Sequence, residues 1–397
     1  MYPTISDFLY ALTGKAIFLP IQTFGFFMAL AFLTALILAH KEFLRLEKAG
    51  ILQASIETKI VGRPASIFDI LLNGVLGFVV GYKGIEMLMN WKAFSQNPQE
   101  FILSSDGNLI GGLIFGALMA FFHYQEKEKE ELPTPKTVEV SVFPHERVGD
   151  ITILAAVVGV LGSKVFTWIE DIPAFLQDPI GALTSFSGMT YYGGLICAAL
   201  AIAWYARQKQ IPLRRVADVA APPLILGYGI GRLGCHFSGD GDWGIVNTHA
   251  RPDWLSFLPD WAWAYTYPNN VIDAGSTIIP AAECELVNMS GHCRALAEGV
   301  WPTSVYEFLM AFSIFLLLFS LRKNMKVPGL LFSIYFILNG LERFCIEFVR
   351  VNDRYSFLGL ELSQAQIIAL LLMATGGVFA FLSFHFHKKE EDSKVAV

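Results

Sequence analysis

The stretch Gly231–Gly244 (GRLGCHFSGDGDWG) places an arginine, a thiol, an imidazole, a hydroxyl and two carboxylates in a mostly apolar part of the chain. Arg232 has no acidic residue in the two helical turns before it. A charged side chain at the centre of a membrane costs ~2.5–3.5 kcal/mol or more, so Arg232 should face an anion. A guanidinium group binds phosphate through two hydrogen bonds, and we therefore expect a phospholipid phosphate there.

Other ionisable residues also stand in apolar runs. Arg343 and Glu347 are four residues apart, so they share a helical face and can neutralise each other. Lys83 and Lys164 either face a polar cavity or extend their amines to water from the end of a helix.

The segment Pro302–Glu307 (PTSVYE) predicts the start of a helix. Proline is tolerated at the first helical position, and a carboxylate such as Glu307 is favoured near a helix N-terminus. The pair Tyr306 and Glu307 is either an ordinary cap or a polar support for a lipid headgroup that faces Arg232.

Composition predicts that these residues are carried by membrane-spanning helices. The 397 residues are 54% hydrophobic and only 16% charged, against about 25% charged in a soluble domain. We expect an all-α polytopic membrane protein and no nucleic-acid partner. Runs of about twenty apolar residues, enough to cross a bilayer, predict nine transmembrane helices, the first a retained helix and not a signal peptide. They are 18–40, 67–89, 107–125, 148–170, 188–206, 217–236, 303–321, 329–349 and 363–384.

Basic residues predict the orientation of these helices. Alternate loops and the tail after residue 384 hold 19 Lys and Arg, whereas the intervening segments hold six. Because cytoplasmic loops are enriched in Lys and Arg, the N-terminus should lie outside and the C-terminus in the cytoplasm. Gly231–Gly244 then falls at the outer face. Cys284 and Cys293 lie in the outer segment 237–302, where they form either a disulfide or two unrelated thiols.

Residues 69–118 and 150–200 resemble each other and indicate a duplicated two-helix unit. Residues that recur at a constant offset of 81 are Asp69 and Asp150, Lys83 and Lys164, Phe94 and Phe175, Gln96 and Gln177, and Pro98 and Pro179. The glycine pair Gly111-Gly112 recurs as Gly193-Gly194 after a one-residue slip. Paired glycines allow close helix packing, and we expect the second copy to be the functional one.

Taken together, four motifs in order make the chain resemble the phosphatidylglycerol–prolipoprotein diacylglyceryl transferase family. The similarity covers the first helix and about residues 148–384, while 67–127 is an extra two-helix copy. The motifs are Gly188–Ile196 (GMTYYGGLI), Gly231–Gly244, Pro302–Glu307 and Arg343–Arg350 (RFCIEFVR).

The resemblance implies transfer of the diacylglyceryl group of phosphatidylglycerol to the lipobox cysteine of a preprolipoprotein, with release of glycerol phosphate. Such a site must stabilise the leaving phosphate and help a thiol of pKa about 8.5 to ionise. The resemblance also implies the bacterial inner membrane, an active site toward the outer leaflet, membrane lipid and signal peptides as partners, and no metal or soluble cofactor.

By the same resemblance, Arg232 and Arg343 are the two essential arginines and Glu347 orients Arg343. Asp240 takes the place of the signature glutamate, and Tyr192 takes the place of a histidine. The remaining residues implied in lipid binding are Gly193, Gly194, Cys235, Gly244, Tyr306, Glu307 and Arg350.

The chain departs from the family at Phe24, where a tyrosine is usual, at Tyr192 and Cys235, where histidine and asparagine are usual, and at Asn339, where a tyrosine is usual. We therefore predict that His236 supplies the imidazole that position 192 lacks, since histidine accepts protons at neutral pH and tyrosine, with a pKa of about 10, does not. The alternative is that His236 only forms a hydrogen bond at the membrane interface.

Two further functions remain open: a lipid-binding or lipid-translocating protein that keeps the phosphate site without the chemistry, and a transferase with another acceptor. The expected segments are 1–66, 67–127, 128–147, 148–236, 237–302, 303–384 and 385–397.

Overall fold

The computed structural model describes residues 1–19, 21–96, 101–102, 104–184, 190–280, 283–284, 290–357 and 359–395, most of which are helical. These residues form two compact units, which we describe separately. The main unit comprises residues 1–52, 144–165 and 190–397, and the second unit comprises residues 53–143 and 166–189.

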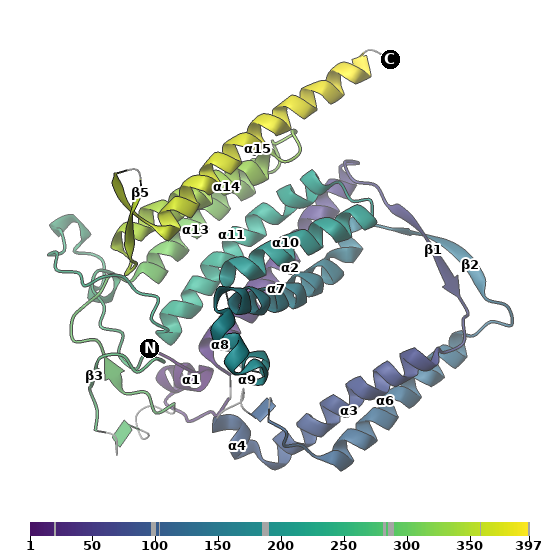
Figure 1. The fold of residues 1–397 in the computed structure, drawn as a ribbon, viewed down its shortest axis with the longest axis horizontal. Coiled ribbons are helices and arrows are strands. Elements are labelled where there is room, and N and C mark those ends of the chain that lie inside the picture. Colours follow the sequence, from purple (N-terminus) through teal and green to yellow (C-terminus); the bar gives the residue numbers. More distant parts are fainter. Residues whose placement is uncertain are drawn as a thin grey trace. The chain divides into compact units, whose positions relative to one another are not determined.

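The main unit consists mainly of helices (Figure 1). Its helices are α1 (Ile5–Thr13), α2 (Thr23–Lys48), most of α7 (Val148–Glu170), α10 (Tyr191–Gln208), α11 (Leu213–Ser238), α13 (Thr303–Leu321), α14 (Leu330–Ile346) and α15 (Gln364–Val395). The sequence analysis did not predict α1. Helix α2 continues past residue 40, the predicted end of the apolar run, and these further turns were missed because they carry basic residues such as Arg45 and Lys48.

Six helices in the described residues are long and apolar enough to cross a membrane. They are Thr23–Lys48, Ile67–Met89, Leu109–Glu130, Pro144–Glu170, Thr303–Leu321 and Gln364–Lys389. The other three predicted spans correspond to α10, α11 and α14. All three contain charged residues, which lower their hydropathy, and α14 has only 17 residues. The chain is therefore a mostly helical, multi-pass membrane protein.

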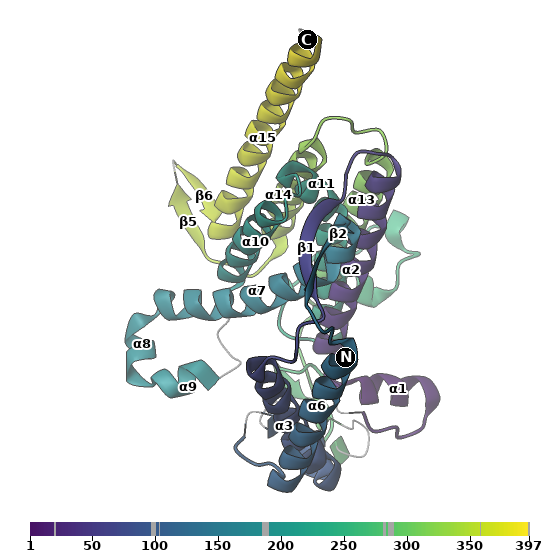
Figure 2. The same ribbon diagram turned by 90° about the vertical axis from the view of Figure 1, so that its right-hand side faces the viewer.

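Helix α11 is central to the main unit because it packs against α2, α13 and α14. The fully buried Ala221 and Ala311 lie where α11 meets α13, in a core that also contains Ile225, Leu318 and Leu331. Helices α14 and α15 lie side by side (Figures 1 and 2). These contacts bring the C-terminal end of α11 close to the start of α13.

Helix α11 ends at Gly239, whose φ of 68° lies in the left-handed region. Glycine adopts this conformation without steric penalty and commonly ends helices. Gly241 has a φ of 98°, so the chain turns again before Asp242. These two turns direct the chain back toward α13.

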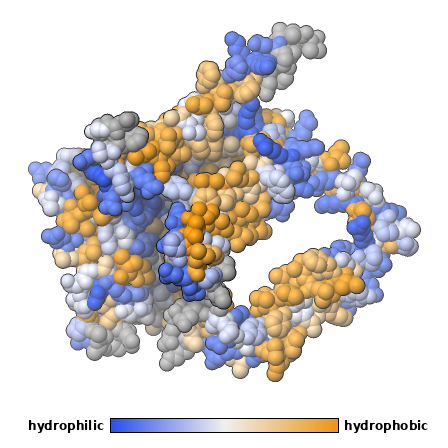
Figure 3. All heavy atoms as spheres, in the orientation of Figure 1, coloured by the Kyte–Doolittle hydropathy of each residue, from blue (hydrophilic) through white to orange (hydrophobic). Residues whose placement is uncertain are grey.

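The second unit contains the helix pair α3 (Ile67–Met89) and α6 (Leu109–Glu130) and the antiparallel strands β1 (Ser55–Val61) and β2 (Lys136–Val142). Apolar side chains cover the surface of the helix pair (Figure 3). Its short helices are α4 (Trp91–Gln96), α8 (Ile172–Gln177) and α9 (Pro179–Thr184). The two strands correct the purely helical prediction. They lie in segments predicted only as charged loops, and each strand is seven residues long.

Within each of the two similar segments, the two helices pack against each other at a glycine. A Cβ on Gly81 would lie 2.5 Å from the Cβ of Phe115, and a Cβ on Gly162 would lie 2.5 Å from the Cβ of Cys197. These two glycines are 81 residues apart in the sequence, and their partners are 82 residues apart. Equivalent positions in α3/α6 and α7/α10 therefore make equivalent contacts, and a side chain would prevent both.

The segment between α11 and α13 folds into short turns and strands. It contains η2 (Asp253–Leu255), η3 (Asp260–Ala262) and the strand pair β3 (Ser276–Thr277) and β4 (Arg294–Ala295). A disulfide joins Cys284 and Cys293. A hairpin of β5 (Arg354–Phe357) and β6 (Leu360–Ser363) precedes α15, and the 3-10 turns η1 (Pro144–Arg147) and η4 (Glu347–Val349) precede α7 and follow α14.

Candidate functional site

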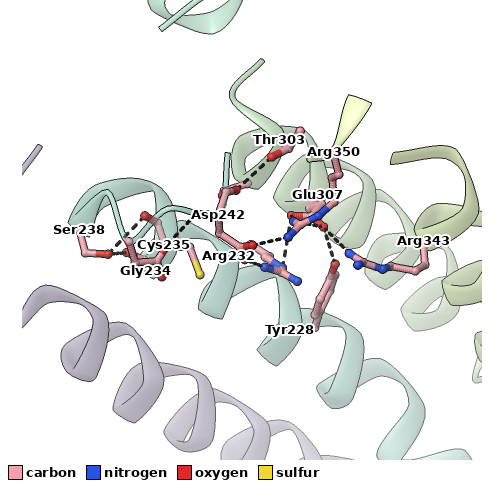
Figure 4. A network of polar contacts seen from close by, with 12 residues as sticks. Tyr228, Arg232, Gly234, Cys235, Ser238, Asp242, Thr303, Glu307, Arg343 and Arg350 are labelled. Atoms are coloured by element: carbon pink, nitrogen blue, oxygen red, sulfur yellow. Dashed lines mark hydrogen bonds and ion pairs between the residues drawn. The ribbon is translucent and has the colours of Figure 1, made fainter. Parts of the chain in front are cut away.

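Three arginines meet in the main unit. Arg232 lies in the second-last turn of α11, Arg343 near the end of α14, and Arg350 directly after η4. Figure 4 shows their guanidinium groups converging on Asp242 and Glu307. We call Arg232, Arg343 and Arg350 the arginine cluster. The structure thus brings together two arginines that the sequence selected for a phosphate and a third that it placed in lipid binding.

Glu307 is the common partner of the arginine cluster. Its side chain is fully buried near the start of α13, and its Oε2 lies 3.3 Å from Nε of Arg232. Its Oε1 lies 3.2 Å from Nη1 of Arg343 and 3.3 Å from Nη1 of Arg350. Glu307 therefore holds the three arginines at one place from the opposite helix.

Asp242 is the second carboxylate of the site. It forms ion pairs with both Arg232 and Arg350. Its backbone carbonyl accepts hydrogen bonds from the hydroxyl groups of Thr303 at 3.0 Å and Ser304 at 2.7 Å. Its side chain is 26% exposed, whereas that of Glu307 is 0% exposed. Asp242 is thus the carboxylate of this pair that water can reach.

The structure places Asp242, and not Asp240, against the arginine cluster. The Asp240 carboxylate instead accepts a hydrogen bond from the thiol of Cys235, and burial raises the pKa of this carboxyl group. The left-handed turn at Gly241 separates the two aspartates and turns Asp242 toward Arg232. The resemblance selected Asp240 by its place in the motif, but the motif spacing does not show this turn.

Glu347 and Gly244 hold two members of the arginine cluster, Arg343 and Arg350, in place. Glu347 Oε2 lies 3.1 Å from Nη2 of Arg343, which is the predicted pair at a spacing of four residues. Gly244 forms an isolated β-bridge with Arg350, and a Cβ on Gly244 would lie 2.9 Å from the Cβ of Trp301. Glycine is therefore required at position 244 because the backbone passes close to its neighbours.

Tyr306 and Glu307 contact different partners. The hydroxyl of Tyr306 donates to the backbone carbonyl of Ala262 at 2.7 Å, in the turn η3. Tyr306 therefore attaches the segment before α13 to the start of that helix, while Glu307 binds the arginines.

His236 lies among aromatic rings. Its buried ring is 5.9 Å from the ring of Trp261, 5.8 Å from that of Tyr265 and 5.5 Å from that of Tyr267, centroid to centroid. Its Nδ1 lies 3.2 Å from the hydroxyl of Tyr267, and burial raises the pKa of this tyrosine, which keeps the hydroxyl protonated. These contacts of His236 do not include the arginine cluster.

The glycines of the first motif pack helices. A Cβ on Gly194 would lie 2.8 Å from the backbone oxygen of Gly159 on α7, and the carbonyl of Gly193 faces Gly162. Tyr192 is in the first turn of α10. Gly188 and Met189, which begin this motif, lie outside the described residues.

Two residues that the sequence analysis did not select also belong to the site. The hydroxyl of Tyr228 lies 3.2 Å from Oε1 of Glu307 and 3.4 Å from Oε1 of Glu342. Tyr228 stands one helical turn before Arg232, and Glu342 directly precedes Arg343. Their positions close to Arg232 and Arg343 in the sequence are the feature by which they could have been selected.

Lys83 has a structural role within the second unit. Its Nζ donates to the backbone carbonyls of Phe101 at 2.9 Å, Ser104 at 2.6 Å and Asp106 at 2.7 Å. The amine therefore satisfies carbonyl groups in the connection between α3 and α6.

The arrangement can bind an anion. Three guanidinium groups are balanced by three carboxylates, those of Asp242, Glu307 and Glu347. Guanidinium groups form strong paired hydrogen bonds with phosphate oxygens. A phosphate that replaces the accessible Asp242 carboxylate would meet both Arg232 and Arg350.

Comparison with known proteins gives one family. Residues 114–382 match the family model of prolipoprotein diacylglyceryl transferase. This match begins within α6 and contains the whole arginine cluster with its partners.

Similar proteins named phosphatidylglycerol–prolipoprotein diacylglyceryl transferase occur in several bacteria. The protein from Dehalococcoides mccartyi is 28% identical over 250 residues, which cover 62% of this chain and 81% of that protein. The protein from Chlorobaculum tepidum is 26% identical over 306 residues, covering 72% and 90%. The protein from Xylella fastidiosa is 28% identical over 247 residues, covering 59% and 76%. Because the family model matches more than half of its length, this chain belongs to the prolipoprotein diacylglyceryl transferase family.

Proposed function

We propose that the protein transfers the diacylglyceryl group of phosphatidylglycerol to the lipobox cysteine of prolipoproteins and releases glycerol phosphate. The observation that carries this proposal is the arginine cluster, which lies between the apolar helices of a member of this family. Such a site suits a lipid phosphate because the headgroup carries the anion and the acyl chains remain in the bilayer.

The lipid phosphate replaces the Asp242 carboxylate. Asp242 is the more exposed of the two central carboxylates, and it contacts Arg232 and Arg350. Glu307 stays in place because its side chain is fully buried and is held by all three arginines. The phosphate then binds between fixed cations, and Glu307 keeps these cations oriented.

The reaction forms a bond between the cysteine sulfur and a glycerol carbon and breaks the bond from that carbon to the phosphate oxygen. Negative charge develops on the leaving phosphate, where preorganised cations stabilise the transition state. Arg232 and Arg350 contact the phosphate. Arg343 is held between Glu307 and Glu347 and supports the charge from the other side.

We propose His236 as the group that accepts the thiol proton. In this role its Nδ1–H donates to the hydroxyl oxygen of Tyr267, which leaves Nε2 to accept a proton. Tyr192, which occupies the place of the family's histidine, is the second residue to which we assign a catalytic role.

The proposed location is the bacterial inner membrane, with nine spans, an outer N-terminus and a cytoplasmic C-terminus. The excess of basic residues in alternate loops supports this orientation. The disulfide of Cys284 and Cys293 supports it too, because disulfides persist in oxidising compartments. The arginine cluster then faces the outer leaflet.

The test is a transfer assay with phosphatidylglycerol and a peptide that contains a lipobox cysteine. We expect a thioether-linked diacylglyceryl peptide from the wild type and none from Arg232→Ala or Arg343→Ala. Arg251→Ala is the matched control, since Arg251 pairs with Asp260 outside the site, 2.9 Å away, and its loss should leave transfer intact. Tight binding of phosphatidylglycerol without product would instead identify a lipid-binding protein.

A further inference from the structure

Tyr228 lies between two carboxyl groups. Its hydroxyl is 3.2 Å from Oε1 of Glu307 and 3.4 Å from Oε1 of Glu342. A phenol has one proton and can donate it to only one of them. If both contacts are hydrogen bonds, one of the two carboxyl groups must therefore be protonated and donate its proton to the phenol oxygen.

Glu307 is the acceptor of the Tyr228 proton. The same Oε1 of Glu307 also accepts from Arg343 at 3.2 Å and Arg350 at 3.3 Å, and these cations stabilise a carboxylate. The contact between Tyr228 and Glu342 is then a hydrogen bond only if Glu342 carries a proton and donates it to the phenol oxygen.

The surroundings of Glu342 favour the neutral acid. The residue is 4% exposed, and its Oε2 has no hydrogen-bond partner among the described residues. A buried carboxylate with an unpaired oxygen loses its hydration without replacement, and a neutral acid loses much less. The charged or titratable groups that act on Glu342 are Tyr228 and Arg232 on α11, Glu307 on α13 and Arg343 on its own helix.

Tyr228 connects Glu342 to the arginine cluster, where the leaving phosphate is proposed to bind. The ring of Tyr228 lies 5.1 Å from the guanidinium carbon of Arg232, and its hydroxyl shares an acceptor oxygen with Arg343 and Arg350 (Figure 4). A phosphate in the place of Asp242 meets Arg350, and Arg350 also contacts the Glu307 oxygen that accepts from Tyr228.

We propose that Glu342 is a protonated carboxylic acid that supplies a proton through Tyr228 to the phosphate as it leaves. This inference rests on the proposed transferase function. The sulfur–carbon bond forms and the carbon–oxygen bond breaks, and the oxygen keeps the electron pair. Tyr228 gives its proton to the phosphate and receives the proton of Glu342. The thiol proton goes to the base and from there to water, and Glu342 takes up a proton from water after the product leaves. Glu342 acts through Tyr228 and does not itself contact substrate.

The first experiment reads the proton on Glu342 without any turnover. Infrared spectra of the wild type at neutral pH should show the C=O stretching band of a protonated carboxyl group, and this band should be absent in Glu342→Gln. Tyr228→Phe should keep the band at a shifted frequency, because the acid loses its acceptor. A wild type without the band, or a band unchanged in Glu342→Gln, overturns the proposal.

The second experiment measures transfer in a single turnover. Glu342→Gln keeps the shape of the acid but has no proton to give, so we expect unchanged affinity for phosphatidylglycerol and a rate lowered by roughly a hundredfold or more. The wild-type rate should fall at alkaline pH as Glu342 ionises, and the variant should lose this dependence. Tyr228→Phe should show the same loss of rate.

The outcomes separate the two proposals. A wild type that transfers the lipid while Glu342→Gln transfers it at the same rate and with the same pH profile refutes the proton supply alone. A wild type that shows the infrared band but forms no product refutes the transferase function, and with it the proton supply.

Discussion

Replacing Asp242 with asparagine tests whether the lipid phosphate displaces this carboxylate. Asp242 forms ion pairs with Arg232 and Arg350, and its backbone is held separately through Thr303 and Ser304. Asparagine preserves the backbone contacts and the size of the side chain. It removes the charge and offers one carbonyl oxygen in place of two carboxylate oxygens. We expect the variant to bind phosphatidylglycerol more tightly than the wild type.

The size of the effect follows from the contacts that the phosphate must replace. A hydrogen bond to a charged group contributes ~1.5–3 kcal/mol, and a neutral one contributes ~0.5–1.5 kcal/mol. Two contacts that lose their charge therefore weaken the competitor by about 2 kcal/mol. Asp242 is 26% exposed and Arg232 is 18% exposed, and solvent screening reduces this to about 1 kcal/mol. The Kd should fall by roughly fivefold.

The assay is titration of the protein in nanodiscs with phosphatidylglycerol at low ionic strength. Asp240→Asn is the matched variant, because Asp240 carries the same charge two residues away but binds Cys235. We expect its affinity to stay within about twofold of the wild type. Thermal unfolding of each variant shows whether the fold is retained.

A folded Asp242→Asn protein that binds phosphatidylglycerol more weakly than the wild type would refute this reasoning. Asp242 would then hold the arginines in position, and the phosphate would bind beside it. An equal gain in affinity in Asp240→Asn would also contradict the reasoning, because a general change of charge near the arginine cluster would explain both results.

Three further changes test other parts of the structure. His236→Ala and His236→Phe should both abolish transfer if the imidazole accepts the thiol proton, whereas a role in packing alone predicts that Phe retains activity. Replacing Cys284 and Cys293 with serine should lower the free energy of unfolding by ~2 kcal/mol, measured by thermal unfolding, and loss of lipid binding at the arginine cluster would contradict a purely local role. Gly81→Ala should destabilise the second unit by ~1–3 kcal/mol through overpacking, because its Cβ meets the facing helix, while Gly84→Ala, with no atom within 4 Å, should be tolerated in the same measurement.

The sequence predicted the positions of the helices and the arginines well because both depend on local signals. A charged residue in an apolar run identifies Arg232 and Arg343, and a spacing of four residues identifies the pair of Arg343 and Glu347, which lie 3.1 Å apart. Glu307 was selected as part of a polar pair at a helix start facing Arg232, and Arg350 by resemblance; the structure pairs the two.

Other parts of the site depend on turns and contacts between distant segments. The choice between Asp240 and Asp242 depends on the left-handed conformation of Gly241, which no spacing rule gives. Tyr228 and Glu342 are 114 residues apart, so their contact follows only from the packing of α11 against α14. The strands β1 and β2 pair across 75 residues or more, from Val61 with Lys136 to Ser55 with Val142, and short strands in charged segments give no strong periodic signal.

The glycine contacts between α3 and α6 bear on how a membrane protein can grow by gene duplication. Helices α3 and α6 pack against each other, since Gly81 of α3 faces the Cβ of Phe115 in α6. Both are apolar enough to span a membrane, and two spans return the chain to the side from which it left. A copied pair therefore preserves the orientation of every later helix, whereas a single copied helix would reverse it. Duplication in units of two is thus compatible with an existing active site downstream.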